Sequence, residues 1–146
     1  MKSFILACIL VSMITPVRSE PVSENFPPAS TSTLSTSDRI LARAFKSKTS
    51  GFMVKFFGTV IRKLPDDTVG SRHQRFVVRL NSGQTLLIAH NIDLAPRVAH
   101  LKTSNTVSIY GEYIWNSEGG IVHQTHDHAD GSKGGGWIRH KGVVYR

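Results

Sequence analysis

Hydrophobic and polar residues alternate through much of the chain after residue 51, which is the pattern of β-strands that bury one face. The clearest stretch is 73–80, where Phe76, Val78 and Leu80 share one face. Arg75, Val77 and Arg79 occupy the other. Because such stretches recur between turn-forming residues, the sequence predicts five strands. Their expected ranges are 52–64, 73–80, 84–91, 106–116 and 121–126.

The loop between the second and third strands fixes their register. Residues 81–83 fit a three-residue hairpin in which Gly83 takes the left-handed conformation. That loop places Phe76 opposite Ile88, which pairs apolar with apolar on the core side.

The same register distributes polar residues between the two faces of this hairpin. Gln74 faces His90 on the core side, and His73 faces Asn91 on the outside. We therefore expect a buried, structural hydrogen bond between Gln74 and His90. His73 and Asn91 are expected to belong to a surface site.

Helices are expected in two places, one of them after a spacer. Residues 20–37 are rich in Ser, Thr and Pro and predict a disordered linker. Residues 38–50 predict a short basic amphipathic helix, capped by Ser37, that packs on its own domain. A second short helix is expected over 94–101, where Pro96 falls in the first turn.

The predicted order is β-β-β-α-β-β, preceded by the N-terminal amphipathic helix. This is the order of the OB-fold, a small five-stranded Greek-key barrel used mainly for binding. The expected fold class is therefore all-β, with a small OB-like β-barrel over 51–146. Two apolar runs, 137–138 and 143–145, are expected to pack on it as a hairpin. A generic β-roll is the alternative fold.

The start of the chain has the features of a targeting sequence. Lys2 precedes the apolar run 4–14, and Val17 and Ser19 suit the −3 and −1 positions of a cleavage site. Residues 1–19 therefore predict a signal peptide, and an exported protein, periplasmic or secreted. The alternative is an uncleaved membrane anchor, but the apolar run is shorter than the about 20 residues that span a bilayer.

The composition gives the chain a basic net charge and excludes internal disulfide bonds. The chain has 18 Lys and Arg against 10 Asp and Glu, a formal charge of +8. Removing Lys2 and Arg18 with the signal peptide leaves 16 against 10, or +6. Such a charge favours anionic partners, nucleic acid or polysaccharide among them. The only cysteine, Cys8, lies in the predicted signal peptide, which excludes a disulfide framework and a Cys-rich zinc module.

An OB-like barrel would bring several polar segments to one end. Its first three strands run up, down and up, the fourth pairs antiparallel with the first, and the fifth lies parallel to the third. Five of the 7 histidines fall in the segments that then meet. Those segments contain Asp66, Asp67, His73, His90, Asn91, Asp93, His123, His126, Asp127 and His128.

Histidines and carboxylates in this combination suit a divalent metal such as zinc or manganese. The candidate ligands are His90, His123 and His126. Asp67 or Asp93 is then a ligand or the base that activates a bound water. On a continuous strand His123 and His126 point to opposite faces, so the two converge only if the strand ends or bulges between them. The alternative is that these histidines hydrogen-bond strand ends and loops.

A basic surface beside this cluster predicts a binding site. In OB-folds the second and third strands and two of the loops form the usual surface for oligonucleotides or oligosaccharides. The residues expected there are Asp66, Arg72, His73, Arg75 and Asn91. Arginine suits phosphate recognition, but no stacking aromatic side chain can be placed on this face. A solvated charged face without a ligand is the alternative.

The chain contains the runs 64–67 (LPDD), 70–76 (GSRHQRF), 82–97 (SGQTLLIAHNIDLAPR), 111–113 (GEY), 115–116 (WN) and 119–120 (GG), with His123, Thr125 and His126. These runs resemble a bacterial family of small exported proteins that is catalogued as a domain of unknown function. The resemblance implies an exported, OB-like domain and assigns no activity. The family usually has tryptophan at the position of Gln124 and Asp-Pro at 128–129, where this chain has His-Ala.

Three functions remain open from the sequence. The leading hypothesis is an exported OB-like domain that binds an anionic ligand at its basic, His- and Asp-rich end. The second is a metal-dependent hydrolase acting on phosphodiesters. The third is a non-catalytic structural or stress protein of the cell envelope.

Overall fold

The computed structural model describes residues 33–130 and 134–146, so the predicted signal peptide and most of the predicted linker lie outside the described residues. The described chain contains one α-helix and seven strands. They are α1 (Thr36–Ser47), β1 (Phe52–Lys63), β2 (His73–Arg79), β3 (Thr85–Asn91), β4 (Thr106–Ile114), β5 (Ile121–His123), β6 (Trp137–His140) and β7 (Val143–Tyr145).

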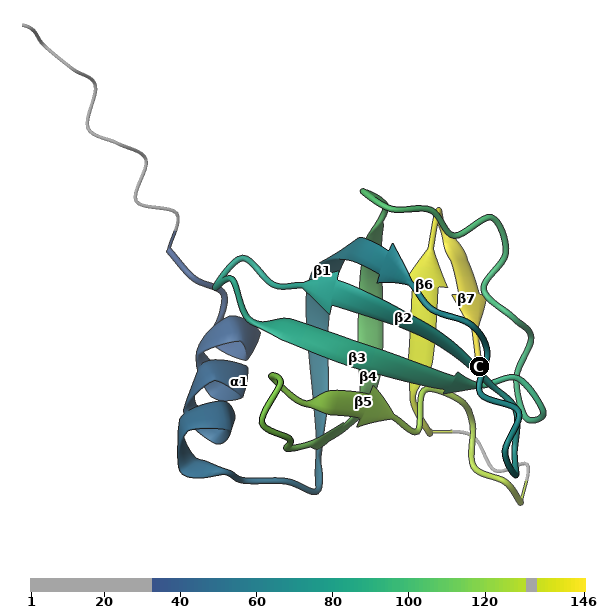
Figure 1. Ribbon diagram of the computed structural model, residues 1–146, viewed down its shortest axis with the longest axis horizontal. Coiled ribbons are helices and arrows are strands. Elements are labelled where there is room, and N and C mark those ends of the chain that lie inside the picture. The colour runs from purple at the N-terminus through teal and green to yellow at the C-terminus, as the bar shows by residue number, and fades with distance from the viewer. Residues whose placement is uncertain (1–32, 131–133) are drawn as a thin grey trace, which may run out of the picture. The chain divides into compact units, whose positions relative to one another are not determined.

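Strands β1 to β5 close into a barrel in the order β1-β2-β3-β5-β4, with β4 returning to β1. Strand β3 is parallel to β5, whereas β4 is antiparallel to both β1 and β5. These directions confirm the predicted all-β, OB-like barrel. Figure 1 shows α1 on one side of the barrel and the β6–β7 hairpin, which extends the sheet from β4, on the other.

The barrel interior is filled by the apolar faces of the strands. The predicted hairpin register is confirmed, because Phe76 lies opposite Ile88 and Gly83 has a φ of 87° in the connecting turn. Burial of each such side chain contributes about 1.5–3 kcal/mol. The fully buried members include Phe56, Val60, Phe76, Val78, Leu86, Ile88, Val107, Ile109, Tyr113 and Val122.

Helix α1 packs against the barrel through one side. It begins at Thr36, two residues before the predicted start, because the Ser35 hydroxyl and not that of Ser37 caps it by accepting a hydrogen bond from the Asp38 N–H, 3.0 Å. Leu41 and Ala44 are buried against the core. The indole N–H of Trp115 donates to the Phe45 carbonyl, 3.0 Å, which ties the helix to the end of β4. Among the described residues no helix is long and apolar enough to cross a membrane.

The helix predicted over 94–101 is wrong, because the connection from β3 to β4 consists of turns and irregular backbone. Its backbone groups are bound by side chains from the barrel. The Val98 N–H donates to Gln74 Oε1, and its carbonyl accepts from Gln74 Nε2, 2.9 and 3.2 Å. Nδ1 of His140 donates to the Ala99 carbonyl, 3.1 Å. Pro96 adds a local cause, since the residue before a proline is disfavoured in the α conformation.

Candidate functional site

Polar side chains at one end of the β2–β3 hairpin are divided between the inside and the outside of the barrel. Gln74 pairs with His90 and His73 pairs with Asn91 in the predicted register. Gln74 and His90 are buried, and His73 and Asn91 are partly exposed on the outer face. The two sides therefore form two separate polar environments.

On the inner side, His90 is a structural residue with both ring nitrogens engaged. Nε2 donates to the Pro96 carbonyl, 3.0 Å, so in the neutral ring Nδ1 accepts from the Thr125 hydroxyl, 2.8 Å. Burial lowers the pKa of the imidazole below its usual value. The expected Gln74–His90 hydrogen bond is wrong, because each side chain binds the β3–β4 connection instead of the other. With both nitrogens bound to protein oxygens, His90 presents no lone pair to a metal.

Gly111 on β4 makes room for the segment that carries Thr125. A Cβ atom at this position would lie 2.6 Å from the His123 carbonyl oxygen and 2.7 Å from the Thr125 methyl carbon. Atoms that close must move apart. The absence of a side chain at Gly111 therefore lets the chain cross β4 closely and places Thr125 beside His90.

On the outer side, β5 ends at His123 and Gln124 takes the left-handed conformation with a φ of 52°. This break satisfies the condition for convergence, because His123 and His126 line the same pocket. The pocket has a volume of about 350 Å³ and adjoins a second one of about 320 Å³ that shares its central residues. We call the two together the histidine groove. It is lined by Asp67, His73, Arg75, Ala89, Asn91, Leu94, Ile114, Ile121, His123, Gln124, His126, His128 and Ala129.

Backbone carbonyls hold two of the groove imidazoles in one orientation. Nδ1 of His73 donates to the Ser71 carbonyl, 2.7 Å, and Nδ1 of His126 donates to the Asp127 carbonyl, 2.6 Å. In the neutral rings Nε2 then carries the lone pair, whereas in the protonated rings Nε2 is a second donor. Within residues 33–130 and 134–146 neither Nε2 makes a hydrogen bond with the protein.

His123 lies opposite Glu112 across the β4–β5 ladder, and its Nε2 is 3.1 Å from Glu112 Oε2. Glu112 lies in the family-like run 111–113 but was not predicted as a site residue. The β4–β5 register could have identified it, but the turn at 116–120 that sets this register has no simple two- or three-residue form.

Two carboxylates at this end of the barrel, those of Asp93 and Asp66, form ion pairs with arginines. Asp93 accepts from the Arg72 backbone N–H and from its Nε, both 2.7 Å. The backbone hydrogen bond, followed by the guanidinium contacts, holds the pKa of Asp93 below its ordinary value. Asp66 likewise forms an ion pair with Arg97. These pairs connect the β1–β2 loop to the β3–β4 connection.

Asp67 and Arg75 line the part of the groove next to β2. Asp67 exchanges two backbone hydrogen bonds with His73, 2.9 and 3.0 Å, and its Oδ1 accepts from the Val69 N–H, 3.1 Å. Nε of Arg75 donates to the Pro65 carbonyl, 3.0 Å. Ile114 and Ile121 provide an apolar floor here.

The structure brings together six of the ten predicted site residues and separates four. The groove contains Asp67, His73, Arg75, Asn91, His123 and His126, and adds His128 and Gln124. His90 lies inside the barrel, while Asp66, Arg72 and Asp93 form the ion pairs outside the groove. In the described part of the chain, no three His, Cys, Asp or Glu side chains are grouped closely enough to hold a metal ion.

Comparison with known families identifies the domain without assigning an activity. The model of a family described as "Protein of unknown function (DUF3465)" matches residues 26–146. The chain belongs to this family. The match confirms the predicted family resemblance and covers α1 together with the whole barrel. A search of curated proteins found no significant match.

Proposed function

We propose that this member of the family binds an anionic ligand in the histidine groove. The observation that carries the proposal is the composition of the groove, where hydrogen-bond donors outnumber carboxylates. Imidazoles, two side-chain amides and the Arg75 guanidinium line it, whereas Asp66 and Asp93 are paired with arginines elsewhere. Oriented donors that outnumber the one lining carboxylate, Asp67, favour phosphate or carboxylate groups.

The groove also indicates which part of a ligand it contacts. Its apolar floor, Ala89 with Ile114 and Ile121, offers no aromatic ring for base stacking. Recognition then depends on the charged groups of an anionic polymer, an oligonucleotide or an acidic polysaccharide. The net charge, +8 for the full chain and +6 without the predicted signal peptide, attracts either polymer over a longer range.

Titration at two salt concentrations tests the proposal. Octathymidylate and an oligogalacturonate are titrated into the protein at about 50 and 200 mM salt, since phosphate contacts weaken steeply over this range. We expect at least one polymer to bind at low salt, and to bind more weakly at the higher salt concentration. The double variant His73→Gln, His123→Gln is expected to lose this binding. Binding of neither polymer, or unchanged binding by the variant, would overturn the proposal.

A metal-dependent hydrolase is the second candidate, supported by one observation. His73 and His126 donate Nδ1–H to backbone carbonyls, which is how metal-binding histidines are commonly oriented. In this version His123 and His126 are the ligands, zinc or manganese is the ion, and Asp67 holds the reacting water. Elemental analysis and a chelator-sensitive melting temperature would support it. If the protein contains no metal and its melting temperature does not change with added zinc or manganese, the hydrolase proposal is contradicted. The anion-binding proposal is unaffected by that result.

Export through the N-terminal segment is a separate proposal that rests on the sequence. The basic charge and the loss of Cys8 on cleavage suit an oxidising compartment that contains anionic polymers. Mass spectrometry of the protein recovered from cells tests it, with cleavage after Ser19 as the expected result. Recovery of only the uncleaved chain in the membrane fraction would contradict it.

A further inference from the structure

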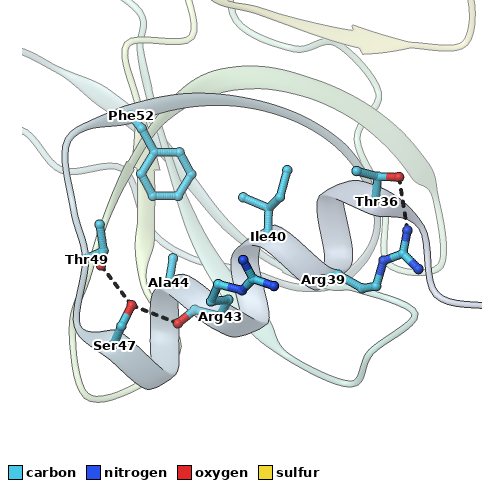
Figure 2. Close-up of a pocket in the computed structure, with 8 residues that line it drawn as sticks. All are labelled: Thr36, Arg39, Ile40, Arg43, Ala44, Ser47, Thr49 and Phe52. Atoms are coloured by element: carbon cyan, nitrogen blue, oxygen red, sulfur yellow. Dashed lines mark hydrogen bonds between the residues drawn. The ribbon is translucent and has the colours of Figure 1, made fainter.

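A second pocket, of about 420 Å³, lies between α1 and the start of β1, away from the histidine groove. One flank of the helix forms most of it, at positions three and four residues apart, and Phe52 forms the opposite wall. Figure 2 shows Ile40, Ala44 and Phe52 facing the same space, with Arg39 and Arg43 beside it along the helix.

The apolar wall of this pocket is held at a fixed position by packing against the core. Phe52 contacts the buried Tyr113 ring at a centroid distance of 5.4 Å. Leu41 anchors α1 from another side of the helix, so Ile40 is left 46 % exposed. An apolar surface therefore stays open at a fixed position next to the helix.

Two guanidinium groups give the pocket its charge. Neither Arg39 nor Arg43 forms an ion pair with a carboxylate within the described ranges, and no acidic residue lines the pocket. Within the described residues, the Arg39 guanidinium makes one hydrogen bond, to the Thr36 hydroxyl at 3.4 Å. Since the arginines lie one helical turn apart on the same flank, they can bind a single carboxylate or similar anion together.

We propose that this pocket binds a single-chain anionic amphiphile, such as the anion of a medium-chain fatty acid. Arg39 and Arg43 hold the anionic head, and the chain lies between Ile40, Ala44 and Phe52. The volume falls at the small end of ligand pockets, which suits one acyl chain and not a two-chain lipid. The proposal is independent of the histidine groove, because the two sites share no residue.

Calorimetric titration of the full chain with decanoate, kept below its micelle concentration, tests this inference. Decanol and acetate serve as probes of the chain alone and the head alone. We expect decanoate to bind and both controls to bind at least about tenfold more weakly, because an ion pair and apolar burial are both needed. Equal binding of decanol and decanoate would overturn the proposal, as would no binding of decanoate.

Matched variants assign the binding to the pocket. The double variant Arg39→Gln, Arg43→Gln should weaken decanoate binding about tenfold or more, and Ile40→Ser several-fold. Lys46→Gln with Lys102→Gln removes the same charge outside the pocket and should leave binding unchanged. Equal losses in both double variants, or binding to anionic phospholipid vesicles without binding of free decanoate, would contradict the assignment.

Discussion

His90 inside the barrel and His73 in the groove lie at the same end of the β2–β3 hairpin, yet they have different chemistry. His90 is fully buried and binds Pro96 and Thr125, whereas His73, one strand away, is partly exposed and uses only Nδ1. Alternation along the strand produces this difference, because neighbouring residues face opposite sides of the sheet. The histidine content of this segment therefore does not indicate one site. It indicates a structural contact beneath the proposed binding surface.

Protonation is expected to act on the inner side of the barrel. Burial lowers the pKa of His90, so the folded protein favours its neutral form. A fall in pH is thus expected to weaken the fold through the inside of the barrel.

The largest effect is expected from removal of the inner histidine. His90→Ala should lower the free energy of unfolding by about 2–4 kcal/mol, because it leaves a cavity and two unpaired polar groups. Chemical denaturation measures the loss. The matched outer substitution, His73→Ala, should cost less than about 0.5 kcal/mol. Similar costs for both would remove the distinction between the two sides.

A methyl group at Gly111 is expected to disturb the inner side indirectly. Gly111→Ala should cost about 1–3 kcal/mol, because the new Cβ meets the His123 carbonyl and Thr125. The exposed Gly142 has open space around its Cβ position but a positive φ of 82°, so it is a poorer control than Ser117→Ala in the β4–β5 turn. A stability like that of the control would show that the β5 end does not depend on close packing against β4.

Near neutral pH, above the range in which Asp93 titrates, the pH dependence of stability should be moderate and traceable to His90. Since the folded-state pKa of His90 lies below the unfolded value of about 6.5, its contribution is complete above that pH and is lost as the pH falls. The slope from this group is at most about 1.4 kcal/mol per pH unit, until the lower folded-state pKa is reached. His90→Gln should remove this part of the slope. The same slope in the protein and the variant would place the titration elsewhere.

The smallest stability effect is expected in the groove itself. The double variant His73→Gln, His123→Gln should unfold within about 0.5 kcal/mol of the unchanged protein, because both side chains are partly exposed. Its loss of anion binding would then come from the groove and not from unfolding. A cooperative loss of stability comparable to that of His90→Ala would mean that the groove residues are structural.

The register of β2 and β3 could be predicted because residues 81–83 form a simple turn and Phe76 must face the core. The hydrogen-bond partners of His90 could not be predicted from the sequence. They depend on the irregular path of residues 92–105, where a short apolar stretch with a proline resembles the start of a helix. Side chains from distant strands, Gln74 and His140, determine that path.

The groove was predictable in part for a similar reason. Strand directions placed the histidines at one end of the barrel. The approach of His126 to His123 depends on a left-handed backbone at Gln124, which non-glycine residues adopt infrequently. No local sequence pattern predicts this left-handed conformation. The pairing of Asp66 and Asp93 with arginines was also missed, because it joins two loops whose conformations were unknown.

Imidazole resonances give the most direct test of the distinction between a structural histidine and a binding surface. Nitrogen-detected NMR spectra of the side chains can be recorded while octathymidylate or oligogalacturonate is added at low salt. We expect the imidazole resonances of His73, His123 and His126 to shift, and we expect His90 to stay unchanged and neutral throughout. Shifts at His90 alone, or spectra that no anion alters, would contradict it.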